Sequence, residues 1–201
     1  MPDITSLILD DHDRFRRDFA TLDDLTDSQE LARAWHGLAD QLEVHAAAEE
    51  EIFYPELVRR GEDAEAETLD AVGDHNEIRD ALRHAARHPV GSTAWQEAVR
   101  QARVANSNHM AEEEDDALAD FRKSADPGMR EELGRRFLAF KDEHDAAHGL
   151  DTSDVDPQRY VEEVEAEQAG QAGRGPADAS LGIGSLKGPV KGPVKGPVKG
   201  H

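Results

Sequence analysis

The sequence predicts an all-α protein: an up-down-up-down four-helix bundle, followed by a fifth C-terminal helix and a disordered tail. Apolar residues recur at intervals of three or four over long stretches, and no stretch alternates convincingly with a period of two. Short segments rich in turn and capping residues separate the stretches. Four stretches each place one histidine on the apolar face, which favours a bundle with a polar layer in its core: His12, His45, His75 and His109.

Composition excludes several classes of function. The chain has 201 residues and a net charge of −21, which argues against nucleic acids and anionic membrane surfaces as partners. It has no cysteine, so any metal must be held by histidine and carboxylate, a donor set that suits iron, manganese or zinc. The sequence has no apolar run of signal-peptide or transmembrane length. We therefore expect a soluble, cytoplasmic protein without a membrane partner.

The first two helices are expected at residues 5–25 and 29–60. A stripe with alternating steps of four and three marks the first: Ile8, His12, Phe15, Phe19 and Leu22. Thr26 with Gln29, or Asp27 with Glu30, offers a capping box for the second. Pro55 is a candidate kink near the end of this helix, and Gly61 ends it. The core face of the second helix is apolar except at its centre: Leu31, Trp35, Leu38, Leu42, His45, Glu49 and Ile52.

Three more helices follow. The third is expected at residues 62–87 and the fourth at 94–123, with Thr93 and Gln96 as a second candidate capping box. The break at residues 124–128 restarts a fifth helix, with Asp126 as its cap and Pro127 at its first position, which continues to about His148.

We expect three regions along the chain: the bundle at residues 1–150, an acidic linker or short helix at 151–169, and a tail at 170–201. The short helix would lie around residues 160–167. The tail is rich in Gly, Pro and Lys and ends in Lys-Gly-Pro-Val repeats, which hold neither a helix nor a central strand. Its net charge is +4 against −25 for residues 1–169, so docking on the acidic body is the alternative to plain disorder.

The four histidines are expected to lie at one level of the bundle. Their separations are 33, 30 and 34 residues, and the midpoints of these intervals fall on the predicted turns. Residues equidistant from a turn lie at the same height in antiparallel helices. His45 and His109 are each followed one turn later by a glutamate on the same face, Glu49 and Glu113.

This arrangement suits two metal ions bridged by two carboxylates. The second and fourth helices are diagonal in such a bundle, so their glutamates approach the centre from opposite sides. His12 and His45 would hold one ion, and His75 and His109 the other. Glu50 and Glu114 stay open as alternative ligands, because adjacent acids let the assignment slip by one residue. We prefer Glu113, since it lies about 40° around the helix from His109, against about 140° for Glu114.

Other polar residues near these motifs are expected to lie outside the centre. Apart from the alternatives above, the neighbouring acids are expected to form a solvated face. Tyr54 lies about 180° around an ideal helix from His45, so it should not face the metals. His144 and His148 have metal-ligand spacing, but a charge role at the end of a helix or plain surface exposure is the preferred interpretation.

The motifs resemble the hemerythrin-like, or HHE cation-binding, family over about residues 5–122. The resemblance implies a four-helix bundle around an oxo- or hydroxo-bridged di-iron centre, with two Fe ions as cofactors and O2, H2O2 or NO as small-molecule partners. The matching motifs are Asp11-His12, His45-x-x-x-Glu49 within HAAAEEEIFYP, Asp74-His75-Asn76-Glu77, and His109-x-x-x-Glu113 within HMAEEED.

Arg79 departs from the oxygen-carrying members, which have a second histidine at this position of the third helix. The pattern His, HxxxE, HxxxR, HxxxE resembles a bacterial group implicated in peroxide and redox chemistry. Arginine stays protonated and does not ligate metal. Arg79 could pair with a carboxylate, orient a bound peroxide or extend toward solvent.

Three functions follow as hypotheses. The first is a redox protein that reacts with peroxide, like a catalase, or senses O2 or NO. The second is an O2- or iron-binding protein without catalytic turnover. The third is an acidic bundle whose histidines are purely structural.

Overall fold

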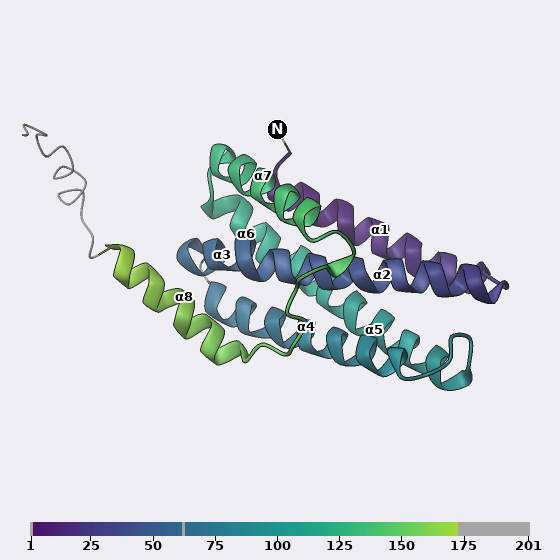
Figure 1. Cartoon of the computed structure of the whole chain (residues 1–201). Coiled ribbons are helices and arrows are strands. Elements are labelled where there is room, and N and C mark those ends of the chain that lie inside the picture. Colours follow the sequence, from purple (N-terminus) through teal and green to yellow (C-terminus); the bar gives the residue numbers. More distant parts are fainter. Residues whose placement is uncertain (1, 62, 173–201) are drawn as a thin grey trace, which may run out of the picture.

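The computed structural model describes residues 2–61 and 63–172, and these form helices with no strand. The all-α bundle predicted from the sequence is confirmed, with the long helices side by side in Figure 1. The helices are α1 (Ile4–Asp24), α2 (Ser28–Ala48), α3 (Tyr54–Arg60), α4 (Ala64–Ala86), α5 (Thr93–Asp115), α6 (Ala117–Ser124), α7 (Pro127–Glu143) and α8 (Pro157–Ala172). A π-helical turn, Glu49–Phe53, joins α2 to α3, and a 3-10 turn, Asp145–Ala147, follows α7.

Local sequence signals set the helix starts. The Asp27 carboxylate accepts hydrogen bonds from the backbone N–H groups of Gln29 and Glu30, which caps α2. Asp126 caps α7 in the same way, with Pro127 in its first turn as expected. The cap of α5 is Ser92, whose hydroxyl accepts from the Trp95 N–H, one residue before the predicted cap.

Two apolar clusters pack above and below the histidine layer. On α1, Ile8 belongs to one cluster and Phe15 to the other, with His12 between them in the sequence. On α4, Val72 and Ile78 flank His75 in the same manner. Apolar side chains therefore bound the histidine layer on both sides along the bundle axis.

The helix expected at residues 29–60 is not a single α-helix. The Tyr54 N–H bonds to the carbonyl of Glu49, five residues back, which defines the π turn. Pro55 lies in the first turn of α3, and because it has no N–H it cannot make the next α-helical bond. The helix expected at 94–123 also divides, because Asp116 departs from helical geometry (φ −110°, ψ −79°) between α5 and α6.

The C-terminal elements cover the bundle. Helix α7 packs along α1 and α2, and α8 packs against α3 and α4 (Figure 1). The segment between them is held on α4 by Asn76, whose side chain donates to the Val155 carbonyl at 2.7 Å and accepts from the Val155 N–H at 2.9 Å. Helix α7 ends at Glu143, earlier than expected, and α8 is longer than the short helix expected at 160–167.

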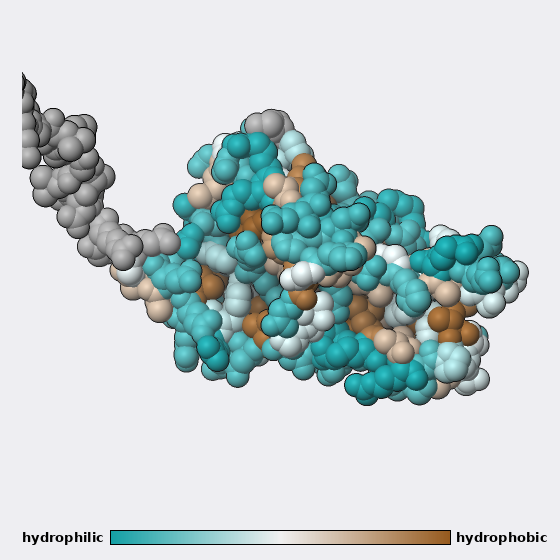
Figure 2. Space-filling model, in the orientation of Figure 1, coloured by the Kyte–Doolittle hydropathy of each residue, from teal (hydrophilic) through white to brown (hydrophobic). Residues whose placement is uncertain are grey.

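The three-region division at 150 and 169 stays a prediction, and the predicted tail lies, from residue 173, outside the described residues. The face of the molecule in Figure 2 is mainly hydrophilic, with small scattered apolar areas. None of the helices in the described ranges is long and apolar enough to cross a membrane.

Candidate metal centre

The four predicted histidines meet in the core, one each from α1, α2, α4 and α5. The ring centroids of His12 and His45 are 5.3 Å apart, and those of His75 and His109 are 4.6 Å apart. The rings of His12 and His109 are separated by 6.4 Å. None of the four residues is more than 3% exposed. The equal distances from the turns therefore place the histidines at one level, as their spacing predicts.

Glu49 lies between two pairs of histidines. Its Oε1 is 3.0 Å from Nε2 of His45, and its Oε2 is 3.3 Å from Nε2 of His75. Glu113 approaches from the diagonal helix, with Oε2 3.3 Å from Nε2 of His12. Donor atoms within 4.8 Å of one another form two groups that share Glu49: His12, His45, Glu49 and Glu113, and Glu49, His75 and His109.

Four buried donor atoms of this cluster face one another in two pairs and make no other hydrogen bond within the described residues: His12 Nε2 with Glu113 Oε2, and His45 Nε2 with Glu49 Oε1. Buried charged groups of this kind are stable only when they are paired or coordinate a metal. All four belong to the same donor group, and imidazole nitrogen with carboxylate oxygen is a common set of metal ligands. The residues present therefore fit a bound metal ion.

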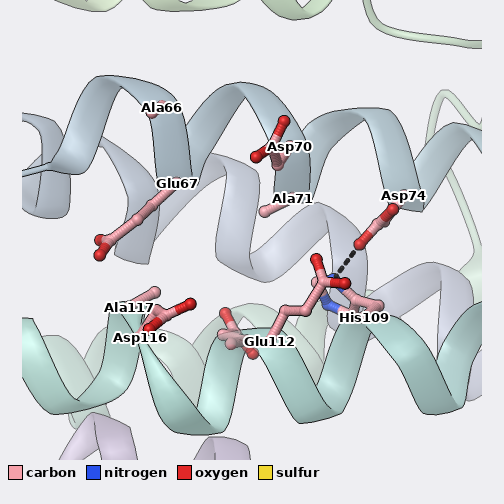
Figure 3. A pocket seen from close by; sticks show the side chains of 10 residues that line it. Ala66, Glu67, Asp70, Ala71, Asp74, His109, Glu112, Asp116 and Ala117 are labelled. Atoms are coloured by element: carbon pink, nitrogen blue, oxygen red, sulfur yellow. Dashed lines mark ion pairs between the residues drawn. The ribbon is translucent and has the colours of Figure 1, made fainter.

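A second set of carboxylates contacts the outer nitrogen, Nδ1, of each histidine. The distances are 3.1 Å from Asp11 to His45, 2.8 Å from Glu114 to His12, 2.9 Å from Glu50 to His75 and 3.6 Å from Asp74 to His109. The last of these pairs is drawn in Figure 3. A carboxylate on Nδ1 holds the proton there, so Nε2 presents its lone pair to the centre.

Each of these outer acids contacts a histidine on a neighbouring helix. Asp11 precedes His12 in the sequence but contacts His45, and Asp74 precedes His75 but contacts His109. One residue is about 100° around a helix, so a neighbour in sequence points to the adjacent helix. Glu50 and Glu114 do the same from the positions after the two glutamates of the centre. Their sequence positions suggest Glu50 and Glu114 only as alternative ligands, and the contacts of all four acids with Nδ1 were not predicted.

The carboxylates make the centre attractive to positive charge. Burial by itself lowers the pKa of His45, but the charges of Glu49 and Asp11 outweigh burial and raise it to about 10. His75 shows the same balance, with Glu49 and Glu50 raising its pKa to about 9. Protons thus neutralise the cluster in the metal-free protein, and a metal cation would take their place.

Arg79 is 2% exposed and pairs with carboxylates on α2 and the π turn. Its Nη2 donates to Glu50 Oε2 at 3.0 Å, and its Nε donates to Glu43 Oε2 at 3.4 Å. Of the three roles considered for Arg79, extension toward solvent is wrong, because the side chain is buried. The contacts correspond to the first role: Arg79 holds Glu50, which in turn contacts His75.

Tyr54 reaches the centre, so the expectation that it faces away is wrong. Its hydroxyl donates to Glu113 Oε1 at 3.2 Å and lies 3.5 Å from Glu49 Oε2, and the residue is fully buried. The cause is the π turn. Five residues span about 500° in an α-helix, which would place Tyr54 about 140° from Glu49. In the π turn the hydrogen bond closes over five residues, so Tyr54 returns nearly above Glu49.

Two histidines that follow α7, His144 and His148, lie outside both donor groups. His144 Nδ1 donates to the Phe140 carbonyl at 3.0 Å at the end of α7, and His148 is exposed with Nδ1 3.1 Å from the Asp145 carbonyl. These contacts agree with the expected roles at the end of the helix.

A helical bundle with a buried cluster of histidines and glutamates defines a cation-binding protein. The sequence model of the Hemerythrin HHE cation binding domain matches residues 3–120, so the chain belongs to that family. Comparisons with curated proteins and with solved structures gave no significant match.

Helices α7 and α8 lie beyond the matched region and still contact the outer layer of the centre. Lys141 on α7 donates to Asp11, and the Tyr160 hydroxyl on α8 donates to the backbone carbonyl of Glu50. Phe137 on α7 also packs its ring 6.1 Å from the ring of His45. The C-terminal helices therefore support the side chains that orient the histidines.

Proposed function

We propose that this chain is a non-haem di-iron protein whose centre carries out redox chemistry with hydrogen peroxide, or senses O2 or NO with the same centre. In this proposal two histidines would hold each ion, and two carboxylates would bind both. The proposed ligands are His12 and His45 for one ion, His75 and His109 for the other, and Glu49 and Glu113 as the shared carboxylates.

The observation that carries the proposal is the position of Glu49. One of its oxygens is 3.0 Å from His45 and the other is 3.3 Å from His75, and both donor groups include it. A carboxylate with its two oxygens directed at two histidine pairs suits a bridge between two metal ions.

Iron is favoured by the donor set and by the family. Imidazole and carboxylate without thiolate suit iron, and the family binds cations. Peroxide disproportionation reduces one H2O2 to two H2O and oxidises a second to O2, and two iron ions would supply and take up the two electrons of these steps, one each. The HxxxR motif at Arg79 adds support, because it resembles the bacterial proteins implicated in such chemistry.

The chain's own residues would position the donors and move protons. The outer carboxylates keep the protons of the histidines on Nδ1, so that Nε2 faces inward. Burial, followed by the charge of Glu113, raises the pKa of Tyr54 well above its ordinary value, so its hydroxyl holds a proton beside both central carboxylates. The buried setting of the ligands, each at most 3% exposed, limits access to small molecules.

The alternative is an O2- or iron-binding protein without turnover. The pairing of Arg79 with Glu50 and Glu43 favours it, because two of the guanidinium nitrogens, Nε and Nη2, are then engaged by carboxylates and are not available to a bound peroxide.

Iron quantitation combined with peroxide assays tests the proposal. We expect about two irons per chain, as for a two-metal site, and steady O2 release during repeated additions of H2O2. His45→Ala and His75→Ala should each lower the iron content and abolish the release. His148→Ala is the matched control, since this exposed histidine lies outside both donor groups.

Two results would decide against peroxide turnover. A chain that binds no iron, and whose His45→Ala variant melts no lower than wild type under iron-replete conditions, would contradict the metal centre itself. Oxidation of bound iron in a single turnover, without further peroxide consumption, would favour the binding protein.

A further inference from the structure

A narrow acidic groove runs from the surface to the candidate metal centre between α4 and the α5–α6 junction (Figure 3). Its volume is about 130 Å³, and none of its described lining residues is Lys or Arg. Six carboxylates line it, three from α4 and three from α5 and its end: Glu67, Asp70, Asp74, Glu112, Glu113 and Asp116.

The carboxylates form a graded series. Residues 67, 70 and 74 are three and four positions apart, which places them along one face of α4. Asp70, Glu112 and Asp116 are exposed, and Glu67 and Asp74 are half-buried. The inner end is formed by buried His109 and Glu113, which belong to the two donor groups of the centre. A charge that enters the groove therefore meets carboxylates at every depth.

The groove has a buried carboxylate oxygen at each end. At the inner end, Glu113 is 3% exposed and its Oε2 lies 3.3 Å from Nε2 of His12 in the candidate metal centre. At the outer end, Oε2 of Glu67 is buried and makes no hydrogen bond within the described residues. Both oxygens can accept a cation.

Repulsion between carboxylates in and near the groove also favours a bound cation. Burial raises the pKa of Glu67, and the nearby charges of Asp120, Asp116 and Asp63 raise it further. A cation at this position would relieve the repulsion. The lining also contains Ala66, Ala71 and Ala117, whose small side chains leave room between the two rows of acids (Figure 3).

We propose that this groove is the uptake route for the metal: it binds a divalent cation transiently and delivers it to His109 and Glu113. The inference rests on the proposed metal centre. The cavity has room for a few water molecules at about 30 Å³ each, so a cation can arrive partly hydrated. It would exchange its waters for carboxylate oxygens as it moves inward, since such oxygens are ligands that hard divalent cations accept.

The groove acts on the rate of loading and leaves the final occupancy unchanged. A cleft lined by one sign of charge raises the association rate of the opposite charge by about 10 to 10³-fold, and salt weakens the effect. Removing three outer carboxylates should therefore slow metal uptake, while the metal ligands and their outer acids stay in place.

Stopped-flow loading of the full-length, metal-free protein with Co²⁺ tests the route, with the visible absorption of bound Co²⁺ as the readout. The test variant combines Glu67→Gln, Asp70→Asn and Asp116→Asn. The matched control combines Glu162→Gln, Glu163→Gln and Glu165→Gln, which remove the same charge from exposed positions of α8. Equilibrium stoichiometry is measured for each protein by metal analysis.

We expect the groove variant to load at least about tenfold more slowly than wild type at low salt, and to reach the same stoichiometry. The control should load within about twofold of wild type. The difference should shrink between about 0.01 and 1 M salt, where the Debye length falls from about 30 to about 3 Å.

Two outcomes would overturn the route. One is a groove variant that loads as fast as wild type, and the other is a control that slows as much as the groove variant, since general charge would then explain the rate. Neither of these two outcomes would contradict the proposed metal centre. Failure of wild type to bind Co²⁺ and iron at equilibrium would instead refute the proposed function itself. A second variant, Asp70→Lys alone, should slow loading further than Asp70→Asn, and equal rates for the two would also contradict the route.

Discussion

Asp11 should control the metal affinity of the centre without touching the metal. It is 4% exposed, and its Oδ2 lies 3.1 Å from Nδ1 of His45. Burial raises its pKa, but the hydrogen bond and charge of His45, with those of Lys141, lower it to about 2, so the carboxylate is charged near neutral pH. Asp11→Asn keeps the side-chain volume and one acceptor oxygen but removes the charge.

The expected loss follows from this contact. Removing an outer carboxylate from a metal-binding histidine typically costs 10- to 100-fold in affinity. Because Asn can still accept a hydrogen bond from Nδ1, we expect the lower end of this range, about tenfold, which corresponds to about 1.4 kcal/mol. His45 contributes to one of the two proposed ions, so the loss should appear in one binding step.

Competition with a chromophoric chelator measures both binding steps. The titration uses Zn²⁺ or Co²⁺ with wild type, Asp11→Asn and the control Asp13→Asn. Asp13 is an exposed acid of the same helix, whose Oδ1 lies 3.3 Å from Arg16. Thermal unfolding of the metal-free proteins separates affinity from stability, because Asp11 also pairs with Lys141 and Arg14.

Equal affinities of wild type and Asp11→Asn in both steps would refute this reasoning. An equal loss in Asp13→Asn would also refute it, because the effect would then reflect net charge and not the orientation of His45.

Four further substitutions probe the surroundings of the centre. Tyr54→Phe should keep the iron content but lower the steady rate of O2 release by about 100-fold, because it removes a positioned proton donor; an unchanged rate would contradict a role in turnover. Arg79→Met should lower the free energy of unfolding in urea by about 3 kcal/mol, because it removes the buried guanidinium and leaves half-buried Glu50 paired with His75 alone, and adding Glu50→Gln should restore part of the loss. Tyr160→Phe should cost about 1 kcal/mol and speed amide exchange in the π turn, since its hydroxyl donates to the Glu50 carbonyl; exchange at the wild-type rate would count against this support. Glu67→Gln should stabilise the metal-free protein at pH 7, because folding raises the pKa of Glu67 and the ionised carboxyl therefore disfavours the folded state. This gain in stability should fade as the pH falls through the raised pKa toward the ordinary value of 4.5, where the carboxyl is protonated. A gain that does not depend on pH would contradict this explanation.

Much of the fold could be predicted because helices depend on local patterns. Periodicity and caps such as Asp27 and Asp126 act within a few residues, so they can be read directly from the sequence. The level of the histidines also follows from simple geometry, since the rise per residue is constant and the turns are short. The structure brings together His12, His45, His75, His109, Glu49 and Glu113, but their assignment as metal ligands stays a prediction.

The surroundings of the centre were harder to predict, because they depend on helix phase and on contacts between helices. Pro55 indicated a disturbance in the second helix, but a proline does not reveal whether the helix kinks or forms a π turn. The choice decides whether Tyr54 faces the centre. One feature of the sequence indicates the contacts of Asp11 and Asp74: each acid stands directly before a core histidine. The spacing alone does not identify which histidine each acid contacts.

By itself, the sequence determined the class of fold, the level of the four histidines, the exclusion of thiolate ligands and the family. Each depends on composition, on local periodicity or on a motif read along one chain segment. Only the tertiary structure decided the position of Tyr54, the partner of each outer carboxylate and of Arg79, and the acidic groove between α4 and α5. These features require contacts between residues far apart in the sequence. One additional residue in the π turn is enough to change which side chains face the centre.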